Sequence, residues 1–187
     1  MMDKNDIIEE LKKDLDKKRF EHTLGVAYTA ACLAMRYYMN IDKAYMAGLL
    51  HDCAKGMSNK ERLSYCDKYN LPVSEVEKEN PSLLHAKVGS HMAKHKYGID
   101  DEAILSAIYY HTTGRPHMEP LEEIIFVADY IEPLRDMDLE LKEIREEAFT
   151  ELRKAIIHIY ANTLKHLTKS DKALDPTTQE AYDYYNG

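Results

Sequence analysis

The 187-residue sequence predicts an all-α fold, and three observations support this prediction. Leu, Ala, Glu, Lys, Met and Ile are abundant, and these residues favour helix over sheet. Apolar residues recur at helical spacing along nearly the whole chain, and no alternating strand pattern or internal repeat is visible. Only seven Gly and six Pro interrupt this pattern. The length fits one compact domain, which we expect to span residues 1–187.

The first four predicted helices have ends that local chemistry explains. Gly56 acts as a stop after the third of them. Ser58 and Glu61 have the spacing of a capping box, which predicts the start of the fourth. The expected ranges are 3–16, 18–39, 43–53 and 59–69.

The remaining helices are separated by Pro and Gly. Pro72 and Pro81 bracket a short connector, and Gly98 separates two later helices. Gly114, Pro116 and Pro120 form a loop before the helix that follows them. The charged segment 136–151 is interpreted as a solvated helix face. The expected ranges are 83–97, 101–110, 120–132, 140–167 and 177–185.

The charge balance and the apolar runs exclude some partners. The net charge of −8 argues against binding of a nucleic acid polymer, which relies on clustered Lys and Arg, but it leaves a small nucleotide open. No apolar run has the length of about twenty residues that a membrane span needs, and no signal peptide is visible. The odd set Cys32, Cys53 and Cys66 suits reduced thiols, so a cytoplasmic location is predicted.

His51 and Asp52 carry the strongest chemical signal. They end the apolar run that starts at Ala44, where a charged Asp is costly to bury unless a cation compensates it. The pair therefore suits a metal in a crevice between helices. The imidazole would supply one bond, and the two carboxylate oxygens could bridge two ions.

Four further His and Asp side chains also lie within or directly after apolar runs of other predicted helices. His22 and Asp129 lie in apolar helices, and His85 and His111 each follow a short apolar run. Each alone would more often be a satisfied polar group of the core. Imidazoles and carboxylates without thiolates favour iron or manganese over structural zinc. Such an ion lowers the pKa of bound water and polarises a phosphoryl oxygen.

The order His, His-Asp, His, His, Asp on successive helices resembles the HD superfamily of metal-dependent phosphohydrolases. Within it, the chain resembles the YqeK family of bacterial symmetrical diadenosine tetraphosphate hydrolases, from about residue 5 to residue 185. The resemblance rests on the segments 19–26, 48–56, 84–89, 110–114 and 128–135. It implies a single HD-domain helical bundle whose partner is a small dinucleoside polyphosphate, with diadenosine tetraphosphate hydrolysed symmetrically to two ADP.

The resemblance also implies roles for individual residues. His22, His51, Asp52 and Asp129 would hold the metal, which is expected to be iron, with manganese as the alternative. A second ion, held by His85 and His111, is left open. Catalysis would involve His51, Asp52, His85 and His111. The substrate would contact His22, Lys55, His85, His111, Thr112 and Arg135.

The tail departs from the family pattern at Asp175 and Asp183, so no nucleotide contact is assigned to it. Two other functions are weighed. One is another HD activity, such as a nucleotidase, a deoxynucleotide triphosphohydrolase or a cyclic-nucleotide phosphodiesterase. The other is a nucleotide-sensing module, against which the complete ligand set argues. A homodimer is left open.

Several residues of reactive type receive an ordinary structural interpretation. His91 and His95 have the i, i+4 spacing of zinc proteases but lack the adjacent Glu. Cys53 is interpreted as a small buried thiol. The remaining histidines are expected on the surface: His117, His158 and His166.

Overall fold

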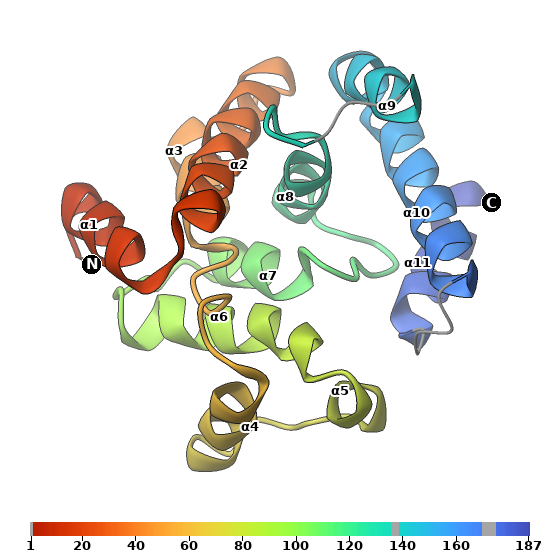
Figure 1. Ribbon diagram of the computed structural model, residues 1–187. Helices are drawn as coiled ribbons and strands as arrows, with labels where there is room; N and C mark the ends of the chain where they lie inside the picture. Colours follow the sequence, from red (N-terminus) through yellow and green to blue (C-terminus); the bar gives the residue numbers. More distant parts are fainter. Residues whose placement is uncertain (1, 136–138, 170–174) are drawn as a thin grey trace.

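The computed structural model describes residues 2–135, 139–169 and 175–187. Within these ranges it contains eleven α-helices, one 3₁₀ turn and no strand, which confirms the predicted all-α class (Figure 1). The first elements are α1 (Lys4–Asp14), α2 (Lys17–Arg36), α3 (Ile41–Leu50), α4 (Asn59–Lys68), α5 (Glu75–Glu79) and η1 (Pro81–Leu83). The others are α6 (Leu84–His95), α7 (Glu102–Tyr110), α8 (Pro120–Ile131), α9 (Leu139–Thr150), α10 (Leu152–Lys169) and α11 (Pro176–Asn186).

The core is formed by α2, α3, α7 and α8 (Figure 1). Helices α3 and α8 each pack on the other three, whereas α2 and α7 do not pack extensively on each other. The buried face of α2 is rich in alanine, which lets α3 approach closely. A Cβ atom at Gly48 of α3 would lie 2.8 Å from Ala27 Cα, so only glycine permits this spacing. The helices that carry the ligand-type residues are therefore held close together.

Helix starts follow local capping chemistry. Asp16 accepts a hydrogen bond from Arg19 N at the start of α2. The predicted capping box of Ser58 and Glu61 is confirmed at α4. A second box, of Ser74 and Glu77, starts α5 inside the segment that the sequence analysis treated as a connector. The same spacing rule would have found it.

Several predicted helix boundaries are wrong. The second helix ends at Arg36 and not at 39. The third helix ends at Leu50 and not at 53, so His51 and Asp52 lie in the turn that follows it. Gly56 therefore does not stop this helix; it allows a close approach to the backbone of Asp14.

The predicted helix 140–167 is divided at Glu151 into α9 and α10. Side chains from the end of α2 explain the break. Arg36 Nε donates to Phe149 O at 2.6 Å, and Tyr37 Oη donates to Ala148 O at 2.8 Å. Carbonyl groups bound in this way from another helix do not need the amides of a continuing helix. Part of the segment 136–151, at 136–138, lies outside the described residues.

No helix among the described residues is long and apolar enough to cross a membrane. Cys53 and Cys66 are buried and Cys32 is exposed, and all three thiols are free. Burial raises the pKa of the Cys53 thiol to about 12, so this cysteine is the small buried thiol that the sequence predicted.

Candidate metal centre and nucleotide cleft

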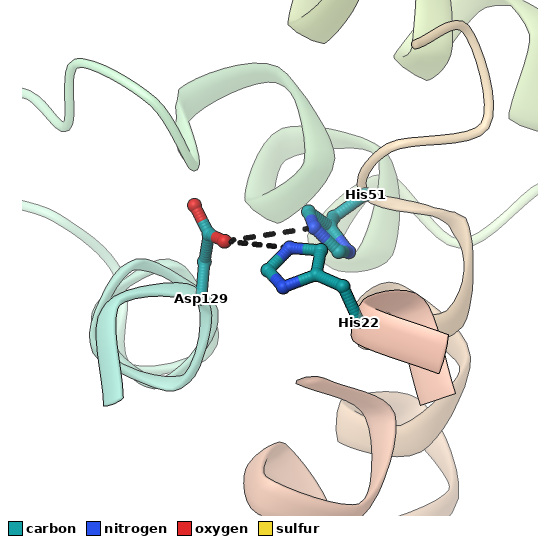
Figure 2. A group of neighbouring side chains, drawn as sticks. All are labelled: His22, His51 and Asp129. Atoms are coloured by element: carbon teal, nitrogen blue, oxygen red, sulfur yellow. Dashed lines mark ion pairs between the residues drawn. The ribbon is translucent and has the colours of Figure 1, made fainter. Parts of the chain in front are cut away.

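The structure brings all six ligand-type side chains predicted from the sequence into one cluster. They come from α2, from the turn after α3, from α6, from the residue after α7, and from α8. Figure 2 shows three of them, with the Asp129 carboxylate facing both imidazoles. Five of the six are less than one-tenth exposed, and Asp129 is half-buried. The six are His22, His51, Asp52, His85, His111 and Asp129.

Asp52 lies at the centre of the cluster, and its two oxygens face different pairs of histidines. The Oδ2 atom lies 3.8 Å from His22 Nε2 and 3.5 Å from His51 Nε2. The Oδ1 atom lies 3.3 Å from His85 Nε2 and 3.6 Å from His111 Nε2. A carboxylate with one oxygen toward each pair has the arrangement needed to bridge two cation positions.

Asp129 completes the group on the Oδ2 side of Asp52. Its Oδ1 atom lies 3.1 Å from His22 Nε2 and 3.8 Å from His51 Nε2 (Figure 2). The expectation that His22 and Asp129 lie within about 8 Å of each other is therefore met.

Backbone carbonyls orient three of the four histidines. His51 Nδ1 donates to Gly48 O at 2.6 Å, and His111 Nδ1 donates to Ile108 O at 2.7 Å. His85 Nδ1 bonds in the same way to the carbonyl three residues before it. Because a carbonyl only accepts, each Nδ1 must carry the proton. Each Nε2 then presents a lone pair to the cluster, which is the form that binds a metal.

The carboxylate of Glu132 orients His22 as the backbone carbonyls orient the other three histidines, through the Nδ1 atom. His22 Nδ1 lies 3.1 Å from Glu132 Oε1, and Glu132 is only 2% exposed. A Cβ atom at Gly25 would lie 2.6 Å from Glu132 Oε2, so glycine makes room for this carboxylate beside α2. Glu132 was not predicted from the sequence, although it lies three residues after Asp129, directly after the end of α8.

The cluster fits a divalent cation by its chemistry. Three of its buried atoms form no hydrogen bond within the part of the chain that the structure describes: His22 Nε2, His51 Nε2 and Asp52 Oδ1. Buried polar atoms without partners are costly, and a cation would satisfy all three. Two overlapping groups have ligand atoms within 4.8 Å of one another. One is His22, His51 and Asp129, and the other is His51, Asp52 and His111.

Three cationic side chains surround the cluster. Arg19 Nη1 donates to Asp52 Oδ2 at 2.7 Å, and Arg135 Nη2 donates to Asp129 Oδ1 at 3.0 Å. Lys55 Nζ lies 3.1 Å from His85 Nε2 and 3.9 Å from Asp52 Oδ1. Lys55 and Arg135 were predicted to be here, and Arg19 was not. Its position three residues before His22 on one helix was the available signal.

The ionisation of the cluster follows from burial and from these charges. Burial lowers the pKa of His51 to about 4, and it also holds the pKa of His85 well below the usual range. Burial acts in the same direction on His22, but Asp129 and Glu132 outweigh it and raise the pKa of His22. Burial would raise the pKa of Asp52, but the neighbouring imidazoles hold it well below its usual range. Near neutral pH the centre therefore combines the neutral imidazoles of His51 and His85 with the ionised carboxylate of Asp52.

The metal-free protein is expected to lose about 1–3 kcal/mol of stability between about pH 7 and about pH 5. Unfolded His51 and His85 take up a proton near pH 6.5, while their folded forms do not, so acid favours the unfolded chain in this window. The raised pKa of His22 has the opposite effect on stability, but it is one histidine, whereas His51 and His85 are two. Urea unfolding in the presence of a chelator at both pH values would measure it. A His51→Gln variant should show a smaller dependence; an unchanged dependence would contradict the assignment.

A cleft of about 550 Å³ opens beside the cluster. Its wall contains Thr112, whose Oγ1 atom lies 3.2 Å from His85 Nε2 and 3.1 Å from His111 Nε2. Further lining residues suited to a nucleotide are Tyr109, Tyr110, Arg115 and the segment 175–177. We call this the tyrosine cleft. No site contact of the tail was expected from the sequence, yet the structure places Asp175–Thr177 in this wall.

A second cleft, of about 360 Å³, opens on the other part of the cluster. We call it the basic cleft. It is lined by Asp16, Lys18, Arg19, His22, Glu132, Leu134 and Arg135.

The histidines interpreted as structural lie outside both possible ligand groups. His91 and His95 stack on α6 with ring centres 4.2 Å apart, and Tyr65 Oη lies 2.9 Å from His91 Nδ1. His117 and His166 are exposed, as predicted. The surface prediction was wrong for His158, which is half-buried and pairs with Glu147 at 3.1 Å. This contact joins α9 and α10 and is not visible from the sequence.

Comparison with known proteins agrees with this geometry. A family model described as HD domain matches residues 19–134. The chain is 37% identical over 183 residues to the symmetrical bis(5'-nucleosyl)-tetraphosphatase of Bacillus subtilis. This alignment covers 98% of this chain and 97% of the relative. The chain is also 37% identical to the protein of the same name from Halalkalibacterium halodurans, over 97% of this chain and 96% of the relative.

A solved structure from Clostridium acetobutylicum has nearly the same fold, with a TM-score of 0.96 and 39% sequence identity. The match covers 100% of this chain and 98% of that chain, which is described as a "predicted HD superfamily hydrolase involved in NAD metabolism".

A helical bundle in which successive helices direct His, His-Asp and Asp side chains to one buried cluster defines an HD-domain protein with a metal-type centre. The identity extends over nearly the whole chain and beyond the HD domain itself. The chain belongs to the HD domain family and, within it, to the family of symmetrical bis(5'-nucleosyl)-tetraphosphatases. This confirms the resemblance found in the sequence.

Proposed function

We propose that this protein hydrolyses diadenosine tetraphosphate symmetrically to two ADP. The observation that carries the proposal is the central carboxylate of Asp52, which has imidazole Nε2 atoms at both oxygens and a nucleotide-sized cleft beside it. Relatives that are 37% identical over nearly their whole length bear the name of this activity. The complete and convergent ligand set argues against a sensing module with a degenerate site.

The proposed cofactor is a divalent metal, with iron as the first choice and manganese as the second. His22, His51, Asp52 and Asp129 would hold one ion, and His85, His111 and the free oxygen of Asp52 would hold a second. His85 Nε2 and His111 Nε2 lie 3.1 Å apart and both face Asp52 Oδ1, and this convergence of ligand-type atoms supports the second position. When bound, the metal would acidify water and polarise a phosphoryl oxygen.

The reaction adds one water across the central phosphoanhydride. The water oxygen forms a bond to the phosphorus that is second from one adenosine, and the bond from that phosphorus to the bridging oxygen breaks. The bridging oxygen leaves with the other half, which is the second ADP. Lys55 and Arg135 lie where they can offset the charge that gathers on these oxygens. Thr112 can donate to a phosphate oxygen from the tyrosine cleft.

We propose that residues 1–187 act as one domain, because α10 packs on α8 of the HD region and α11 packs on α10. Tyr185 Oη of α11 also donates to Glu123 of α8, and the segment 175–177 lines the same cleft as Thr112. The cytoplasmic location and the oligomeric state stay predictions.

The test is product analysis with the purified protein and a panel of dinucleoside polyphosphates, mononucleotides and cyclic nucleotides. Diadenosine tetraphosphate should give ADP alone, and reaction in ¹⁸O-labelled water should label one of the two ADP molecules formed. A chelator should abolish turnover, and iron or manganese should restore it. ATP with AMP as products would contradict symmetrical cleavage. Faster turnover of a deoxynucleotide triphosphate or a cyclic nucleotide would establish another HD activity instead.

A further inference from the structure

The two clefts meet the cluster at different oxygens of one carboxylate. Thr112 of the tyrosine cleft contacts His85 and His111, which face Asp52 Oδ1. Arg19 of the basic cleft bonds to Asp52 Oδ2 at 2.7 Å, and His22 of the same cleft faces this oxygen too. The two clefts therefore border the cluster on the two sides of the Asp52 carboxylate.

The basic cleft has the chemistry of a phosphate site. Its cationic side chains are Lys18, Arg19 and Arg135. Its carboxylates are already directed to protein donors. Asp16 accepts from Arg19 N at 2.9 Å, and Glu132 accepts from Leu134 N at 2.7 Å. These acids therefore compete little with an incoming anion for the cations.

Lys18 is the cation of this cleft that is most available to a ligand. Both arginines donate to carboxylates of the cluster, whereas Lys18 forms no ion pair within residues 2–135, 139–169 and 175–187. Leu134, which is 60% exposed, adds an apolar surface at the same opening. Phosphate oxygens and the apolar faces of a ribose or base are the groups that such a wall accepts.

We propose that the basic cleft binds the second nucleoside diphosphate half of the substrate, while the first half occupies the tyrosine cleft. This inference rests on the proposed function, because only a dinucleotide needs both clefts. Lys18 is then a specificity-determining residue that favours dinucleoside polyphosphates over mononucleotides. The volume of 360 Å³ is at the lower end of the range of about 300–1,000 Å³ for ligand pockets, so this half is held with part of its surface open to solvent.

The test compares two charge reversals on neighbouring residues. Lys18→Glu should raise the KM for diadenosine tetraphosphate about tenfold and leave kcat within about twofold, because Lys18 does not reach the cleaved bond. Lys17→Glu is the matched control. Its side chain is 90% exposed, it pairs with Glu21 and it does not line the cleft, yet the substitution changes the net charge equally. It should change the KM by less than about twofold.

Binding of ADP to the metal-loaded protein, measured by calorimetry, separates the two clefts. If ADP fills the tyrosine cleft first, Lys18→Glu should lower its affinity by less than about twofold. Equal KM values in the two variants would overturn the basic-cleft assignment and leave the proposed function intact. A loss of ADP affinity as large as the rise in KM would also overturn it, because Lys18 would then act on one common nucleotide site. If the unmodified protein forms no ADP from the tetraphosphate, both proposals fail.

Discussion

Replacing Asp52 with Ala is expected to remove the bound metal and to lower kcat at least about 10³-fold. This carboxylate lies within 3.8 Å of four imidazole Nε2 atoms, so its loss removes a ligand from both proposed ion positions. It also leaves Arg19 and Lys55 facing the cluster without their carboxylate partner, which adds a repulsion against any cation. Elemental analysis and steady-state kinetics would measure the two losses.

Asp67→Ala is the matched control for this experiment, because Asp67 is an exposed aspartate of α4 that belongs to neither group of possible ligands. It should retain the parent metal content and kcat. Circular dichroism would confirm that both variants are folded. An Asp52→Ala protein that retains its metal would contradict the assignment of Asp52 as a ligand, whatever happens to turnover.

Replacing His111 with Ala is expected to reduce kcat about 10²–10³-fold and to lower the metal content from two ions per chain to one. His111 places an Nε2 atom on the Oδ1 side of Asp52 only, so His22, His51 and Asp129 would still hold the proposed first ion. The distinctive readout is the metal stoichiometry. A residue that only stabilises the fold would leave it unchanged.

His166→Ala provides the control for His111, since His166 is exposed on α10 and was predicted to lie on the surface. Its metal content and turnover should equal those of the parent. If His111→Ala loses activity but keeps the parent metal content, His111 acts on the phosphates directly. The proposal of a second ion held by His85 and His111 would then be wrong.

Much of the helical framework could be predicted because helix signals are local. Apolar periodicity and the capping box of Ser58 and Glu61 gave the correct element type for the predicted helices, with ends within a few residues. The missed helix α5 has an equally local signal in Ser74 and Glu77. The break at Glu151 has no such signal, since it depends on hydrogen bonds from Arg36 and Tyr37 across the fold.

The ligand-type residues could be named from the sequence because a His or Asp in an apolar run is costly unless something binds it. This reasoning singled out the six candidates, and the resemblance to the HD superfamily then implied His22, His51, Asp52 and Asp129 as the metal ligands. It passed over Arg19 and Glu132, although each lies three residues along the chain from a named ligand. Charged residues are ordinary at such positions, and only their contacts distinguish them.

The sequence by itself determined the fold class, the family and the six residue types of the centre, since these depend on periodicity and on which side chains occur in which order. Only the tertiary structure decided which Asp52 oxygen faces which histidines, and that Asp175–Thr177 borders the tyrosine cleft. It alone placed Lys18, Arg19 and Arg135 around one basic cleft. These features join residues far apart in the chain, and their distances are set by how closely the helices pack, as at Gly48 against Ala27.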